Sequence, residues 1–216
     1  MIWIKYIGFW FLFACSVLWY VSTKISSIRN SLPRSIGIKW LIKMALIFRI
    51  SYASLLTILQ YYLWSNDPFA KLLLNVGIDI SLPLPLVKDL PWLFDNKLGY
   101  FIFYSWGRFW LDVVISLVVA YVFYFFLKIL KRHQERFFEE GEVGLGLALS
   151  LIVGWPGFII FVPLIFISVV IVSMARQILL GERYTTLGVP FIAAALLTLA
   201  TGDWLVRVFN LGLFKI

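Results

Sequence analysis

The sequence predicts an all-α protein, a polytopic bundle of transmembrane helices with about six spans. Of its 216 residues, 62% are hydrophobic and only 14% are charged, whereas a soluble domain carries about 25% charged residues. The apolar residues form runs long enough to cross a bilayer. Basic residues are concentrated between these runs, as is typical of proteins whose orientation follows the positive-inside rule.

The charge and the rare residue types narrow the function classes. The net charge is +8, but the basic residues separate apolar segments, so we expect the lipid bilayer as a partner and no nucleic acid. Cys15 is the single cysteine and His133 the single histidine. An intrachain disulfide is therefore excluded, and we expect no metal and no cofactor.

The lengths of the apolar runs define the helices. We predict a single membrane domain, 1–216, with spans at 2–22, 44–64, 109–127, 143–153, 158–175 and 187–205. A cleaved signal peptide is the competing interpretation of the first run. The run is long enough to span the bilayer, which favours an uncleaved anchor. As one helix, residues 143–175 would be about 50 Å long, too long for a bilayer core of about 30 Å. The Gly154-Trp155-Pro156-Gly157 sequence predicts a turn that divides them. One kinked helix here, the alternative, would give five spans.

The loops predict the orientation in the membrane. Residues 23–43 contain five basic and no acidic residues, which indicates the cytoplasmic side. Residues 65–98 contain four aspartates and four prolines and are predicted to be an extracytoplasmic loop, with a short amphipathic helix at 69–76. We expect a multi-pass protein of the plasma membrane with both termini extracytoplasmic. Arg49, one turn inside its span, is expected to extend its side chain back to the cytoplasmic surface.

Two charged residues are candidates for function inside the membrane. Arg108 and Asp112 are four residues apart, so on a helix they share a face and can pair. An intramembrane carboxylate is a functional candidate. The two residues indicate either a small transporter or a lipid-interacting protein. The alternative is that they form a purely structural ion pair at a helix end.

The C-terminal half contains three motifs in a familiar order. They are Glu140-Gly-Glu142-Val-Gly-Leu145, then Gly154-Trp-Pro-Gly157, and then Val189-Pro-Phe-Ile-Ala-Ala194. Together they resemble the prepilin peptidases (type IV leader peptidases) over residues 137–204. The resemblance implies a membrane aspartic endopeptidase that cleaves leaders of pilin-like precursors, with Glu142 in the place of one catalytic aspartate. It also implies that Glu140, Gly141 and Pro190 belong to the site that binds the substrate.

The sequence departs from this family at both catalytic positions. Glu142 replaces one aspartate, Ser26 stands in the place of the other, and residues 23–43 contain no acid. Asp79 and Asp112 are predicted on the opposite side of the membrane. We therefore favour a divergent, catalytically degenerate relative that binds or positions a pilin-like precursor or another membrane protein. An active peptidase that uses Glu142 with another acid, and a glutamate that merely caps a helix, are the alternatives.

Overall fold

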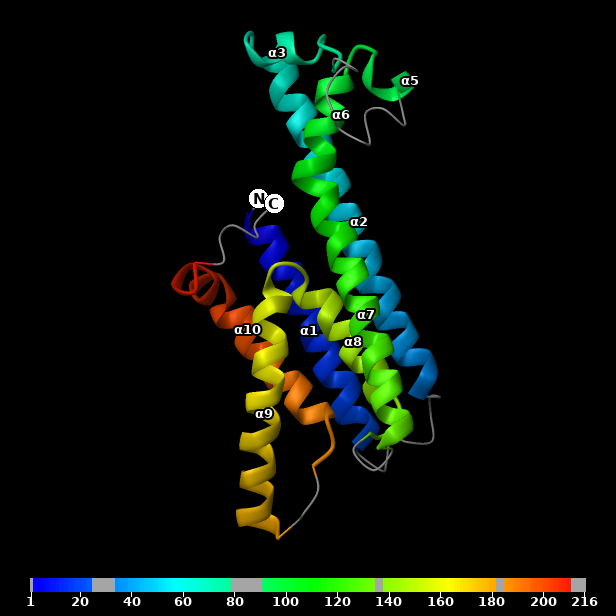
Figure 1. Cartoon of the computed structure of the whole chain (residues 1–216), viewed down its shortest axis with the longest axis vertical. Helices are drawn as coiled ribbons and strands as arrows, with labels where there is room; N and C mark the ends of the chain where they lie inside the picture. Colours follow the sequence, from blue (N-terminus) through cyan, green and yellow to red (C-terminus); the bar gives the residue numbers. More distant parts are fainter. Residues whose placement is uncertain (1, 25–33, 79–90, 135–137, 182–184, 211–216) are drawn as a thin grey trace. The chain divides into compact units, whose positions relative to one another are not determined.

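A computed structural model describes residues 2–24, 34–78, 91–134, 138–181 and 185–210, and its regular elements there are all helices (Figure 1). The prediction of an all-α protein is confirmed. In chain order the helices are α1 (Ile2–Lys24), α2 (Arg34–Asn66), α3 (Ala70–Leu73), α5 (Pro91–Phe94), α6 (Gly99–Ser105), the π-helix η1 (Trp106–Trp110), α7 (Leu111–His133), α8 (Glu142–Val153), α9 (Gly157–Leu180) and α10 (Gly188–Val208).

Among the described residues, five helices are long and apolar enough to cross a membrane. They cover Tyr6–Lys24, Gly37–Asn66, Gly99–His133, Gly157–Leu179 and Gly188–Val208. Helix α8 is a sixth apolar helix of 12 residues, about 18 Å long at 1.5 Å per residue. This arrangement agrees with a multi-pass helical bundle of about six spans.

Two helical segments are longer than the apolar runs predicted. Helix α2 begins at Arg34, inside the basic segment predicted to be a loop, and the helical segment around α7 extends from Gly99 to His133. Hydrophobicity locates the part of a helix that lies in lipid, but the backbone hydrogen bonds of the helix continue into the polar region. The spans 44–64 and 109–127 stay predictions of the part of each helix that lies in lipid.

The described chain divides into two compact units. Residues 1–49 and 115–215 form the first unit, and residues 50–114 form the second. The single membrane domain stays a prediction. Each unit is described separately below.

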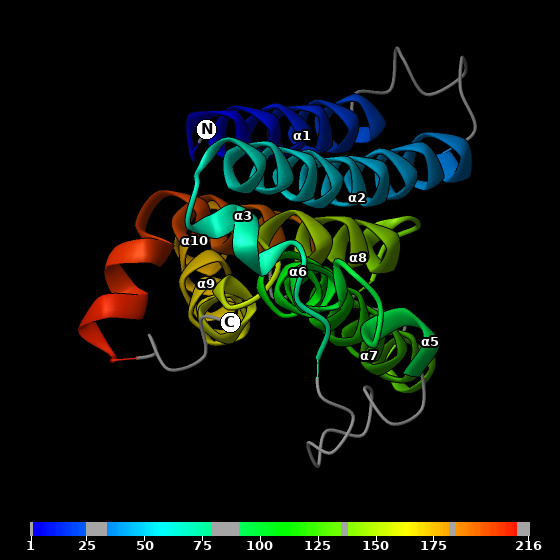
Figure 2. The ribbon, with the colours of Figure 1, turned by 90° about the horizontal axis from the view of Figure 1, so that it is seen from above.

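Helix α8 is the centre of the first unit. Its residues from Leu145 to Ile152 are all buried, and it packs against α1, α9 and α10. Viewed from above, α1 and α7 lie on opposite sides of it (Figure 2). Gly146 allows the close approach of α7 and α10, because a Cβ there would lie 2.5 Å from Leu127 and 3.3 Å from Phe191. A short helix that is hydrophobic on all sides is thus enclosed by the longer ones.

The predicted turn between α8 and α9 is confirmed. Helix α8 ends at Val153, α9 begins at Gly157, and the Trp155–Pro156 peptide bond is cis. Gly154 has φ 61° and ψ −174°, a conformation that is essentially restricted to glycine. The hydroxyl of Ser116 in α7 accepts a 2.9 Å hydrogen bond from the Trp155 backbone N–H. The turn is therefore anchored to the neighbouring helix.

The second unit contains the predicted loop 65–98 and an aromatic cluster. Helix α3 is a single turn within the predicted amphipathic segment, and α5 begins at Pro91, where a missing N–H costs nothing. Leu98 and Tyr100 donate backbone hydrogen bonds to Leu74 and Val76. The aromatic cluster surrounds Trp64, whose ring lies 5.0–6.2 Å from those of Tyr100, Phe101 and Tyr104. Such a belt is typical of a membrane–water interface.

Candidate functional site

The carboxylate of Glu142 connects two segments that are far apart in the sequence. Its Oε1 accepts a 2.9 Å hydrogen bond from the Gly188 backbone N–H at the start of α10. Its Oε2 accepts a 3.0 Å hydrogen bond from the Glu139 backbone N–H, just before α8. The residue is only 2% exposed. Glu142 therefore ties the N-terminus of α8 to that of α10, and we call this arrangement the Glu142 clamp.

Two glycines make room for the clamp. A Cβ on Gly188 would lie 2.3 Å from the ring of Tyr20 and 2.6 Å from Glu142 Oε1. Gly141 precedes α8 with φ 89°, and a Cβ there would lie 2.7 Å from the ring of Trp19. Both glycines allow α1 to pack closely against the ends of α8 and α10. The close packing of Trp19 and the positive φ therefore explain why a glycine stands at position 141 of the motif.

Two buried hydroxyl groups lie beside the carboxylate. They belong to Tyr20 of α1 and to Thr186, which precedes α10. The Thr186 hydroxyl lies near both the Tyr20 hydroxyl and the Glu142 carboxylate. The surroundings of Glu142 are thus polar but closed to solvent.

Burial and hydrogen bonding act on Glu142 in opposite directions. Glu142 is the first residue of α8 and precedes the apolar run predicted to span the membrane, 143–153. Burial raises the pKa of the Glu142 carboxyl, while the hydrogen bonds from Glu139 and Gly188 lower it, and the net pKa lies above the ordinary 4.5. Enclosure therefore has a larger effect than the two backbone donors.

The neighbouring acid, Glu139, is engaged elsewhere. Its carboxylate forms an ion pair with the ammonium group of Lys24 at the end of α1. Both side chains are partly exposed, at 38% and 41%. This pair links the end of α1 to the segment just before α8.

Arg49 forms a second buried polar site at the other end of α8. It is 4% exposed and donates hydrogen bonds to the carbonyl oxygens of Leu151 and Ile152 and to the Ser116 hydroxyl. Its guanidinium also lies 5.0 Å from the centre of the Phe9 ring. The expectation that Arg49 extends to the membrane surface was wrong. The last carbonyl groups of a helix lack hydrogen-bond donors within the helix, and the Arg49 guanidinium donates to two of those of α8.

Arg108 and Asp112 belong to the second unit, and Glu142 belongs to the first. Arg108 is part of the π-helix η1 and lines a cavity of about 300 Å³ with Tyr100, Phe103, Tyr104 and Gly107. Asp112 lies near Tyr52 of α2. The pairing of Arg108 with Asp112 stays a prediction.

The other residues predicted from the resemblance have varied surroundings. Pro190 is fully buried in the first turn of α10, two residues after Gly188, whereas Glu140 is exposed. Ser26 and Asp79 lie outside the described residues. Sequence reasoning identified Glu142 but missed Gly188, Tyr20 and Arg49. Gly188 immediately precedes the Val-Pro-Phe motif, a signal that could have indicated it, whereas nothing distinguishes Tyr20 from other interfacial tyrosines.

Comparisons with protein-family models, curated proteins and solved structures find no match to this chain.

Proposed function

We propose that this chain is a membrane protein with a prepilin-peptidase-like architecture that lacks the peptidase chemistry and instead binds or positions another membrane component. The Glu142 clamp carries the proposal. Both carboxylate oxygens accept hydrogen bonds from backbone N–H groups, and the side chain is almost fully buried. Glu142 thus has the surroundings of a residue that holds two helices together.

Aspartic peptidase chemistry makes different demands on its carboxyl groups. Two carboxyl groups must lie close together, share one proton and both reach one water molecule. Glu139 is the acidic neighbour of Glu142, but its carboxylate forms an ion pair with the ammonium group of Lys24. This supports a structural role for the two glutamates.

The test is cleavage of pilin-type precursors in membranes that contain this protein. We expect no specific leader cleavage, although an authentic prepilin peptidase in the same membranes cleaves the same precursors. A monodisperse elution profile in detergent would establish that the chain is folded. Leader cleavage by the wild-type protein that is lost in Glu142→Gln would refute the proposal.

A second candidate function rests on the second unit. Arg108 lies in a π-helix, an element often found at functional sites, and it borders a cavity of about 300 Å³. A small transporter or lipid-interacting protein would use this charge and Asp112 to form a polar path. Flux or binding should then fall in Asp112→Asn without loss of folding. A double replacement of Arg108 and Asp112 that behaves as wild type would exclude this function.

A further inference from the structure

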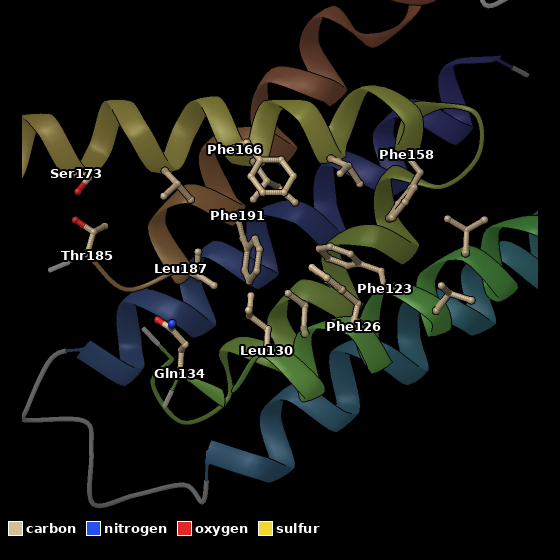
Figure 3. A pocket seen from close by; sticks show the side chains of 16 residues that line it. Phe123, Phe126, Leu130, Gln134, Phe158, Phe166, Ser173, Thr185, Leu187 and Phe191 are labelled. Carbon is tan, nitrogen blue, oxygen red and sulfur yellow. The ribbon is translucent and has the colours of Figure 1, made fainter. Parts of the chain in front are cut away.

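An apolar groove of about 770 Å³ lies between α7 and α9 in the first unit (Figure 3). Its floor includes Phe123 and Phe191, which are 8% and 0% exposed, and its rims include Phe126 and Phe166, which are 50% and 62% exposed. None of its lining residues is charged. Because α7 and α9 both belong to segments long enough to cross the membrane, the open side of the groove faces lipid.

One end of the groove is polar. Gln134, Ser173 and Thr185 line it there, and the hydroxyl groups of Ser173 and Thr185 point toward one another (Figure 3). Thr185 is 7% exposed, and its hydroxyl oxygen has no hydrogen-bond partner in the described part of the chain. A buried hydroxyl that lacks a partner costs free energy, and a ligand with a hydrogen-bond acceptor would remove this cost.

Basic residues flank the same end. Lys131, in the last turn of α7, is four residues after Leu127, which lines the groove. Arg176 is three residues after Ser173. Residues three or four apart share a helix face, so both cations lie on the helix faces that form the groove, near its polar end.

We propose that the groove binds one acyl chain of an anionic phospholipid. The acyl chain covers Phe123 and Phe191. An ester carbonyl of the lipid accepts a hydrogen bond from the Thr185 hydroxyl, and the phosphate lies near Lys131 and Arg176. This goes beyond the proposed function and does not depend on Glu142.

The dimensions of the groove favour an acyl chain over a transmembrane helix. A volume of about 770 Å³ lies within the range of about 300–1,000 Å³ found for sites that hold one small ligand. A helix about 10 Å wide and 30 Å long would occupy roughly 2,400 Å³. The polar end also fits a phospholipid, whose glycerol and phosphate follow directly after the acyl chains.

The experiment measures lipid retention by native mass spectrometry of the full chain in detergent. It compares phosphatidylglycerol, phosphatidylcholine with the same acyl chains, and glycerol phosphate, which has no chain. We expect phosphatidylglycerol to be retained best and glycerol phosphate not to compete. Removing one basic charge, in Lys131→Gln or Arg176→Gln, should lower retention of phosphatidylglycerol about fivefold, since each cation near an anionic lipid surface contributes about that factor.

Three further variants test the groove itself. Val162→Trp fills it and should lower retention of both lipids at least tenfold. Val170→Trp, on the same helix but outside the groove, is 57% exposed in the wild type and should retain lipid normally. Thr185→Val keeps the shape of the side chain and should lower retention several-fold, which preserves the test if Val162→Trp does not fold.

Several outcomes would overturn the proposal. Equal retention of both lipids with no effect of Val162→Trp or Thr185→Val would show that the groove holds only bulk lipid. Competition by glycerol phosphate would indicate a phosphate site without a chain. A dimer that Val162→Trp dissociates would show that a second copy occupies the groove. Leader cleavage would contradict the proposed function and leave this proposal standing, so the two can be distinguished.

Discussion

Replacing Glu142 tests whether the clamp holds α8 and α10 together. Glu142→Gln keeps the size of the side chain and one acceptor oxygen, but its NH₂ group then faces a backbone N–H. In the wild type the two oxygens accept hydrogen bonds of 2.9 and 3.0 Å. A hydrogen bond to a charged group contributes about 1.5–3 kcal/mol, and a buried donor left unpaired costs a similar amount.

The expected loss for Glu142→Gln is therefore about 2 kcal/mol of unfolding free energy. For a chain of 150–250 residues, each kcal/mol changes the melting temperature by about 2–4 °C, so a decrease of about 4–8 °C is expected. Glu142→Leu loses both acceptors and should be less stable still. The assay is thermal unfolding of the purified protein in one detergent, followed by intrinsic tryptophan fluorescence.

Glu140→Gln is the matched control, because Glu140 is also a glutamate at the start of α8 but is exposed. Its change in melting temperature should be small, since exposed charged side chains contribute about 0–1 kcal/mol. If Glu142→Gln melts at the wild-type temperature, or if Glu140→Gln loses as much, the clamp does not stabilise the fold and the reasoning is refuted.

Three further predictions concern the same unit. Gly188→Ala should lower the melting temperature strongly, because its Cβ would lie 2.3 Å from Tyr20, whereas Gly202→Ala, with its nearest contact at 3.6 Å, should melt near the wild type; equal effects would contradict the close packing. Arg49→Met leaves two carbonyls at the end of α8 without their donor and should cost about 3 kcal/mol, and an unchanged melting temperature would exclude this role. The pKa of Glu142 is raised above 4.5 in the folded protein, so the folded state binds the proton more tightly, and the contribution of Glu142 to stability falls as pH rises from 4.5 through the raised pKa. Melting temperatures of wild type and Glu142→Gln across this range should therefore differ in slope, and parallel curves would contradict it.

The helices were predictable because their signals are local. A run of about 20 apolar residues must form a helix in lipid, since no other structure satisfies its backbone. The division between α8 and α9 was predictable too, because glycine and proline at 154–157 prevent a continuous helix. The orientation of the termini stays a prediction, since it rests on the loop charges.

The contacts of Glu142 and Arg49 were not predictable, because their partners are distant in the sequence. Gly188 is 46 residues after Glu142, and Leu151 is 102 residues after Arg49. From the sequence, Arg49 is a cation one turn inside an apolar run, and extension to the surface is the general solution. In the structure, the C-terminal end of α8 lies beside Arg49. Its carbonyl groups need hydrogen-bond donors, so the Arg49 side chain is buried there instead.

The two buried polar residues together explain how a helix as short as α8 is held in the first unit. The last carbonyl groups of a helix need hydrogen-bond partners, which lipid does not supply, and Arg49 donates to those of Leu151 and Ile152. Glu142 places a carboxylate at the N-terminal end, where the helix dipole favours negative charge, and Arg49 places a cation at the C-terminal end, where it favours positive charge. In a peptidase the acid at this end must remain accessible to water and substrate. Here its oxygens accept hydrogen bonds from the backbone N–H groups of Glu139 and Gly188, so the carboxylate connects the start of α8 to the start of α10.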